Sequence, residues 1–206
     1  MYKTEQEKFW QGSFGDRYIL RNKNNQLIKN NFFLFKQIFL KSFKIKNLIE
    51  FGPNVGLNIR ALIKLLKLKS TTAVEINKKA CLELKDIKNV NVINESIINF
   101  SPKKKYDLVL VKGVLIHINP NKLKKVYETI YKSCRNSGYI LIAEYYSSYP
   151  TMVIYRGKRN KLFKRDFAGE FTSLFKKTKI IKYGFAYHKD KHPQDDLNWF
   201  LIKKNG

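Results

Sequence analysis

The sequence predicts an α/β fold: a doubly wound, mostly parallel seven-stranded sheet that ends in an antiparallel hairpin. From residue 46 onward, short apolar runs alternate with helix-length amphipathic stretches, which is typical of parallel βαβ units. The last two apolar runs, 178–186 and 197–203, have no helix between them, so we expect them to pair as the closing hairpin.

The other strands are short and apolar on both faces, as in a sheet that helices cover on both sides. We expect them at 47–51, 71–76, 90–94, 106–112 and 138–145. Helical spacing predicts helices at 55–68, 77–88, 120–135 and 166–175, with Asn77 and Asn119 as N-caps and Pro120 at a first helical position. A very apolar helix at 31–43 must pack on the sheet or on a partner, and packing on the sheet is favoured.

The composition limits the classes of protein that fit. No apolar run reaches the roughly 20 residues of a bilayer span, because even 108–118 contains Lys112, so no membrane span is expected. The polar start lacks the apolar core of a secretory signal, which predicts a cytoplasmic location. Two cysteines and three histidines, Cys81, Cys134, His117, His188 and His192, show no ligand spacing, so no metal is expected.

The net charge is +25, with 41 Lys and Arg against 16 Asp and Glu. Such an excess often indicates a polyanionic partner. Lysines nevertheless occur in every segment, as on solvated helix faces, so a compositional origin is favoured. A phosphorylated or nucleotide-linked small substrate is the next interpretation, and a nucleic-acid partner is not favoured.

The most informative stretch is 48–58, where a strand runs into a glycine-containing turn and then a helix. Gly52 and Gly56 allow a ligand to lie against bare backbone, and the first amides of a helix offer donors to a polar group. Glu75 ends the next strand 19 positions after Gly56. That is close to the spacing of about 20 expected for a carboxylate that binds ribose hydroxyls.

The details of this turn distinguish two ribose-containing ligands. A dinucleotide turn has a central glycine where the backbone meets the pyrophosphate, whereas Pro53 and Asn54 stand here. Glu50 would repel a pyrophosphate but can orient the ammonium group of an amino acid. A ligand with a nucleoside end and an amino-acid end is therefore expected, and S-adenosylmethionine is the common molecule that fits.

At this point the sequence resembles the class I S-adenosylmethionine-dependent methyltransferases. Residues 50–58 are similar to their first motif in the form Glu-x-Gly-x-Asn-x-Gly. Segments 9–22 and 107–120 are similar to a narrower group found with pseudaminic acid and other surface-polysaccharide biosynthesis. The resemblance covers most of 9–145 and, more loosely, the end that contains Trp199.

The resemblance implies one Rossmann-like methyltransferase domain over 1–206. Its parts would be an N-terminal cap and helix at 1–44, a cofactor-binding core at 45–145, and a substrate insertion with closing strands at 146–206. The expected cofactor contacts on the first turn are Glu50, Gly52, Asn54 and Gly56. Those at the ends of the second and fourth strands are Glu75, Ile76, Lys112 and Gly113, and those after the third strand are Glu95 and Ser96. The opening segment would contribute Phe14, Gly15, Tyr18 and Arg21. Many relatives have Asp near Glu95, and Lys112 has two alternative roles, orienting the substrate or capping the strand.

The opening segment has two interpretations. Trp10, Phe14, Tyr18 and Arg21 have the spacing of a helical packing stripe. Gly12 and Gly15 interrupt that helix at a cost of about 1 kcal/mol each relative to Ala, so we expect a loop that closes over a ligand.

His117 follows the fourth strand, where this class places residues beside the methyl group. It is a candidate general base, or a structural histidine in the turn before Pro120. Glu144 and Tyr145 end the fifth strand at the ligand-binding edge of the sheet and are candidate substrate contacts. In the insertion 146–165, a candidate substrate lid, Arg156, Arg159 and Arg165 either pair with a substrate anion or are surface charge.

These patterns predict methyl transfer from S-adenosylmethionine to a small acceptor, with a sugar or sugar-nucleotide hydroxyl or amine favoured. The alternatives are a methyltransferase of RNA or protein, motivated by the charge, and a non-catalytic S-adenosylmethionine-binding or assembly protein. The patterns predict no oligomeric state.

Overall fold

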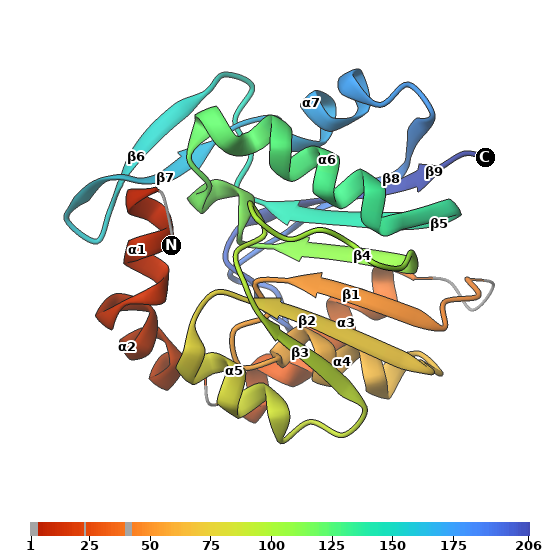
Figure 1. The fold of residues 1–206 in the computed structure, drawn as a ribbon, viewed down its shortest axis with the longest axis horizontal. Coiled ribbons are helices and arrows are strands. Elements are labelled where there is room, and N and C mark those ends of the chain that lie inside the picture. The colour runs from red at the N-terminus through yellow and green to blue at the C-terminus, as the bar shows by residue number, and fades with distance from the viewer. Residues whose placement is uncertain (1–3, 23, 40–42) are drawn as a thin grey trace.

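The computed structural model describes residues 4–22, 24–39 and 43–206. Its centre is a seven-stranded sheet with the strand order β3-β2-β1-β4-β5-β9-β8 (Figure 1). Strands β1 to β5 pair in parallel, and β9 is antiparallel to both β5 and β8. The predicted fold class is therefore confirmed, including the closing hairpin.

The strands that were expected agree closely with those of the sheet: β1 Asn47–Phe51, β2 Ser70–Glu75, β3 Val90–Asn94, β4 Tyr106–Lys112, β5 Cys134–Glu144, β8 Thr178–Ala186 and β9 Leu197–Lys204. β5 begins four residues before the predicted start at 138. A two-stranded antiparallel sheet of β6, Thr151–Tyr155, and β7, Lys158–Lys164, was not predicted and occupies the insertion.

The predicted core helices are present in shortened form: α4 Leu57–Leu65, α5 Lys78–Lys85, α6 Leu123–Ser133 and α7 Phe167–Leu174. Asn77 caps α5 by accepting from the Ala80 amide, as expected. Asn119 and Pro120 begin a short 3-10 turn at Pro120–Lys122 that leads into α6.

The apolar helix begins earlier than predicted. α3 is Asn25–Ile38, because the Asn24 side chain accepts from the Gln26 amide and caps a polar first turn. The prediction that this helix continues to 43 is wrong, because α3 ends at Ile38 and the backbone of Phe39 is extended. Residues 40–42 lie outside the described residues.

The opening segment is helical, so the expected loop is wrong. α1, Glu5–Gln11, begins with a capping box between Thr4 and Glu7, and α2, Ser13–Arg21, follows directly after Gly12. Gly15 lies within α2, where a Cβ atom would stand 1.8 Å from the Trp10 carbonyl oxygen. This glycine therefore permits close packing of the two helices.

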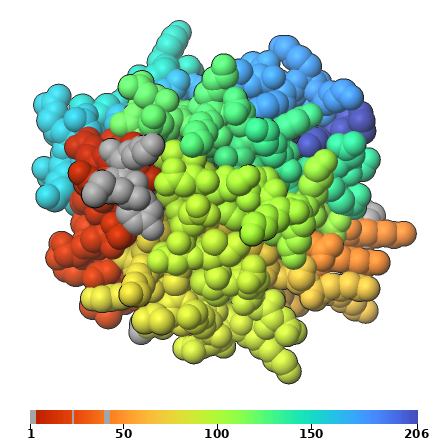
Figure 2. All heavy atoms as spheres, in the orientation of Figure 1, coloured from red at the N-terminus to blue at the C-terminus, as the bar shows by residue number. Residues whose placement is uncertain are grey.

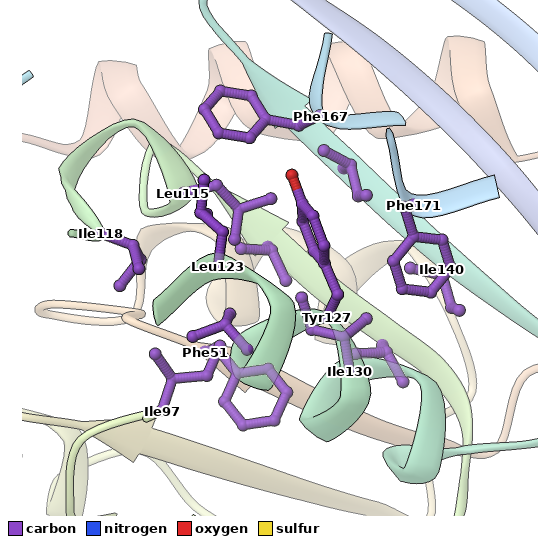
Figure 3. Close-up of a cluster of buried hydrophobic side chains, with 14 of the residues drawn as sticks. Phe51, Ile97, Leu115, Ile118, Leu123, Tyr127, Ile130, Ile140, Phe167 and Phe171 are labelled. Carbon is purple, nitrogen blue, oxygen red and sulfur yellow. The ribbon is translucent and has the colours of Figure 1, made fainter. Parts of the chain in front are cut away.

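Two apolar layers hold the sheet. On one face, Phe51 and Ile140 of the sheet belong to the same buried cluster as Tyr127 of α6 and Phe171 of α7 (Figure 3). On the other face, Leu48, Leu108 and Leu141 pack with residues of α3 and α4. Helices cover both faces of the central strands, which explains why β1, β4 and the end of β5 are apolar on both faces.

The N-terminal helices and the β6–β7 hairpin lie at the edge toward which the parallel strands point (Figures 1 and 2). The Gln6 side chain donates to the Asn160 carbonyl at 2.8 Å, and Lys161 pairs with Glu5 at 3.0 Å. These contacts join α1 to β7. None of the described helices is long and apolar enough to cross a bilayer.

Candidate cofactor and acceptor site

A cavity of about 280 Å³ opens at the carboxyl edge of the sheet. Strand ends β1, β2, β4 and β5, the N-terminal helices, Tyr155 of the hairpin and the β8–β9 loop all contribute to its wall. Ligands of open α/β sheets bind at this edge. The fold thus brings together most of the residues that the sequence singled out.

The turn after β1 has the backbone geometry that its glycines predict. Gly52 and Gly56 have φ values of +65° and +81°, and Asn54 has φ +50°. A Cβ on Gly52 would stand 2.5 Å from a Val114 methyl group, and one on Gly56 would stand 2.5 Å from Ile87. Both glycines are therefore required by conformation and by packing.

Glu75 is buried at the end of β2 with its carboxylate held by backbone. One oxygen accepts from the Asn54 amide and the other from the Asn77 amide, each at 2.8 Å. A carboxylate offers about four acceptor positions, so lone pairs remain for two hydroxyl groups. Burial raises the pKa of Glu75, and these amides oppose that rise.

Glu50 is completely buried on β1. The Asn58 amide group donates to one oxygen at 2.7 Å, and the other oxygen has no hydrogen-bond partner among the described residues. Burial raises the pKa of Glu50 to about 8. A cation placed at the free oxygen would restore the charged form.

Glu50 and Gly56 are not among the residues that line the cavity, whereas other predicted cofactor residues line it directly. Ile76 follows β2, and Glu95 and the buried Ser96 follow β3. At the end of β4, burial lowers the pKa of Lys112, while nearby Asp195, Glu50 and Glu144 act in the opposite sense. The neighbouring backbone is bare, because a Cβ on Gly113 would meet nothing within 4 Å.

Glu144 ends β5 and is 4% exposed. One oxygen accepts from the Val114 and Leu115 amides, each at 2.9 Å, and the other has no partner in the described part of the chain. Burial raises the pKa of Glu144 to about 7. Burial also raises the pKa of the adjacent Tyr145 to about 12.

His117 packs against the rings of Trp10 and Tyr155, at centroid distances of 4.6 and 5.1 Å. Its Nδ1 atom is 2.5 Å from the Lys161 carbonyl oxygen. Because a carbonyl only accepts, Nδ1 carries the proton and Nε2 carries the lone pair. Burial lowers the pKa of His117 to about 4, which makes Nε2 a weak base.

The opening segment supplies aromatic rings to this region, but not all of its predicted contacts. Tyr18 lines the cavity and Phe14 packs edge-on against Tyr155 at 5.9 Å without lining it. Arg21 is exposed and lies outside the lining. The segment is thus a helical cover in which only some faces point inward.

The insertion arginines also lie outside the lining. Arg156, at the hairpin turn, stacks over the Tyr155 ring at 5.7 Å, and Arg159 is exposed. Arg165 pairs with Glu170 at 2.7 Å, which agrees with the surface-charge interpretation.

Several lining residues were not predicted as site residues. The Asn22 side chain donates to Asn54 at 3.2 Å and ties α2 to the glycine turn. Trp10, Asn58, Tyr155 and Asp195 also line the cavity. Asn58 is the last residue of the motif at 50–58 and lies in the first turn of α4, and Trp10 and Asn22 lie in the similar segment 9–22, so the sequence held a usable signal for these three. Tyr155 and Asp195 come from segments without a motif.

The residues present fit S-adenosylmethionine. The orphaned oxygen of Glu50 suits an ammonium group, the spare lone pairs of Glu75 suit ribose hydroxyls, and Gly113 leaves backbone open between them and the acceptor side. In the described ranges, no three His, Cys, Asp or Glu side chains gather as a metal site. The strand order and the antiparallel closing hairpin are those of the class I methyltransferase fold.

Comparisons with known proteins agree with this fold. No protein-family model and no curated protein sequence matches the chain. Among solved structures, 1,6-didemethyltoxoflavin-N1-methyltransferase of Burkholderia thailandensis, with 1,6-didemethyltoxoflavin and S-adenosylhomocysteine bound, has a TM-score of 0.73 at 12% identity, covering 97% of this chain and 87% of that one.

Two further structures are similar. A SAM-dependent methyltransferase from Leishmania major has a TM-score of 0.71 at 15% identity, covering 97% of this chain and 81% of that one. The N-methyltransferase NodS from Bradyrhizobium japonicum has a TM-score of 0.67 at 12% identity, covering 89% and 99%. At these identities the likeness shows that the chain has the fold of S-adenosylmethionine-dependent methyltransferases.

Proposed function

We propose that this protein is an S-adenosylmethionine-dependent methyltransferase that acts on a small acceptor enclosed in the cavity. The observation that carries the proposal is the pairing of Glu50 and Glu75 across the glycine turn, one with a free buried oxygen and one with spare acceptor positions. That pattern suits the two polar ends of this cofactor.

When bound, S-adenosylmethionine supplies a methyl group on a sulfonium, which is electrophilic without further activation. The protein's task is to align a nucleophile with that group and exclude water. Trp10, Tyr18 and Tyr155 cover the cavity, and the contacts between α1 and β7 hold the cover in place.

A sugar hydroxyl or amine, in a cytoplasmic pathway of surface-polysaccharide synthesis, remains the acceptor favoured by the sequence resemblance. A phosphorylated or nucleotide-linked sugar has weaker support, because Lys112 is the only lysine or arginine among the described residues that line the cavity. Two of the similar structures are named N-methyltransferases, which act here as precedents for nitrogen acceptors on this fold.

The test is transfer of label from methyl-tritiated S-adenosylmethionine into a cell extract that is separated into small molecules, RNA and protein. The proposal predicts label in the small-molecule fraction, and loss of that label with Glu75→Ala. Label in RNA or protein would favour the alternative that the net charge motivated. Cofactor binding without label in any fraction would favour a non-catalytic binding protein.

A further inference from the structure

The charge inside the cavity is opposite to that of the chain. Of the 16 Asp and Glu residues, five line it, whereas of the 41 Lys and Arg residues only Lys112 does so in the described ranges. The acidic lining residues are Glu7, Glu75, Glu95, Glu144 and Asp195. A cavity of this kind favours cationic ligands and disfavours anionic ones.

The cofactor accounts for only some of these acidic residues. Along the sheet edge, Glu75 ends β2, Glu50 lies on β1, Lys112 ends β4 and Glu144 ends β5. Neighbouring strands are about 4.8 Å apart, so Glu144 lies three strand spacings, about 14 Å, beyond the predicted ribose position. Glu144 therefore stands at the acceptor end of the row.

The Glu144 carboxylate is fixed in place with one oxygen unused. The Val114 and Leu115 amides hold one oxygen, and the other is buried and accepts from no described residue. A buried carboxylate oxygen without a donor is costly, so a ligand that supplies an N–H group there gains a charge-assisted hydrogen bond.

Aromatic rings complete this end of the cavity. Tyr145 interacts electrostatically with Tyr18, Tyr155, Asp195 and Glu144, which places these groups near one another. The Trp10 ring is 5.2 Å from Tyr18 and 6.4 Å from Tyr155. Carboxylates beside aromatic faces are the combination that recognises organic ammonium groups.

We propose that the acceptor is a small organic amine, and that Glu144 binds its ammonium group and removes the proton that blocks methylation. This inference rests on the proposed function. The ammonium N–H proton passes to the free Glu144 oxygen, which frees the nitrogen lone pair. The nitrogen forms a bond with the methyl carbon as the carbon–sulfur bond breaks, and the bonding electrons stay on sulfur. The product is a methylated ammonium beside a protonated Glu144, which returns its proton to water.

The ionisation of Glu144 suits this step. Its pKa of about 7 arises mainly from burial, opposed by the Val114, Leu115 and Ile116 amides and by Lys112 on β4. Tyr127 on α6 and Tyr145 on its own strand also interact with it electrostatically. Below about pH 7 the protonated carboxyl cannot accept the proton, so the turnover rate falls on the acid side.

The test compares defined acceptors that differ only in nitrogen or oxygen. Wild-type protein is incubated with methyl-tritiated S-adenosylmethionine and one acceptor at a time, in two matched pairs: glucosamine against glucose, and tyramine against tyrosol. In a separate reaction the acceptor is a deproteinised cell extract, whose products are then separated by cation exchange. Label is expected in amines and in the cationic fraction. Protein that binds S-adenosylhomocysteine but labels no amine overturns the inference, whereas protein that does not bind it contradicts the proposed function itself.

The residue is tested with Glu144→Gln, which keeps an oxygen for the Val114 and Leu115 amides. Glu128→Gln on α6 is the matched control, since Glu128 lies outside the cavity lining. Glu144→Gln should lower kcat for the labelled amine at least 100-fold, remove the acid limb of its pH profile, and leave S-adenosylhomocysteine affinity within about twofold. A variant as active as the control, with an unchanged pH profile, overturns the role of Glu144.

Discussion

Binding of the cofactor should release a proton from Glu50. Its pKa of about 8 leaves roughly 90% of the carboxyl groups protonated at pH 7. An ammonium group at the free oxygen favours the carboxylate, so S-adenosylhomocysteine should displace about half to most of one proton. Ionising the group at pH 7 costs about 1.4 kcal/mol, because one pKa unit corresponds to that free energy.

That cost sets the size of the effect. A hydrogen bond to a charged group contributes about 1.5–3 kcal/mol, so Glu50 should improve binding by only about 0–1.5 kcal/mol at pH 7. The hydrogen bond lowers the pKa of Glu50 by only about one to two units in the complex, so affinity should increase by about two- to sixfold per pH unit between pH 6 and 7.5. Glu50→Gln should remove this slope, because Gln keeps the acceptor for Asn58 but does not titrate.

The assay is isothermal calorimetry at pH 7 in phosphate and in Tris, whose ionisation enthalpies differ. The difference in apparent binding enthalpy gives the number of protons released, expected to be about 0.5–0.85 for a gain of about 1.5–3 kcal/mol. 5′-Methylthioadenosine, which lacks the amino-acid end, should bind without proton release. Identical enthalpies in both buffers for S-adenosylhomocysteine would refute the assignment of Glu50 to the ammonium group.

Two further predictions concern stability. Gly52→Ala should lower the melting temperature more than Gly113→Ala, because both glycines have positive φ values but only Gly52 also has Val114 within 2.5 Å of a new Cβ. The backbone strain alone is about 1–2 kcal/mol, and equal melting temperatures for the two variants would contradict the packing argument. Asp107 pairs with Arg135 and accepts from two backbone amides at the start of β1, and these contacts lower its pKa. The ionised Asp107 therefore stabilises the fold above its unfolded pKa, and this contribution is lost as pH falls through its folded pKa. Urea unfolding should show that Asp107→Asn destabilises the protein at pH 7 but changes little near pH 3, and an equal effect at both values would count against the ion pair.

The strands were predictable because each is a short apolar run, buried on both faces at the centre of the sheet and partly exposed in the edge strands β3 and β8. β1, β3, β4 and β8 match their predicted bounds, since short apolar runs between polar turns have few other stable arrangements. The glycine turn and Glu75 were predictable because local backbone geometry and one sequence spacing carry that signal.

The N-terminal cover was not predictable by the same reasoning. Helix propensity counts Gly15 as a helix breaker, whereas its role is to let α2 approach the Trp10 carbonyl, which is a tertiary contact. The free oxygen of Glu144 and the place of Asp195 also depend on loops that pack from distant segments. No periodicity or spacing in the sequence records such contacts.

The central claim is most directly tested by titrating S-adenosylhomocysteine and S-adenosylmethionine into the wild type and Glu75→Ala. Affinity in the micromolar range corresponds to about −8 kcal/mol, and loss of two hydroxyl hydrogen bonds to a carboxylate should weaken it by about 3 kcal/mol or more, at least 100-fold. Far-ultraviolet circular dichroism must show that the variant is folded, because Glu75 also holds the Asn54 and Asn77 amides. Wild-type protein that binds neither molecule, or a folded variant that binds them equally well, would contradict the account.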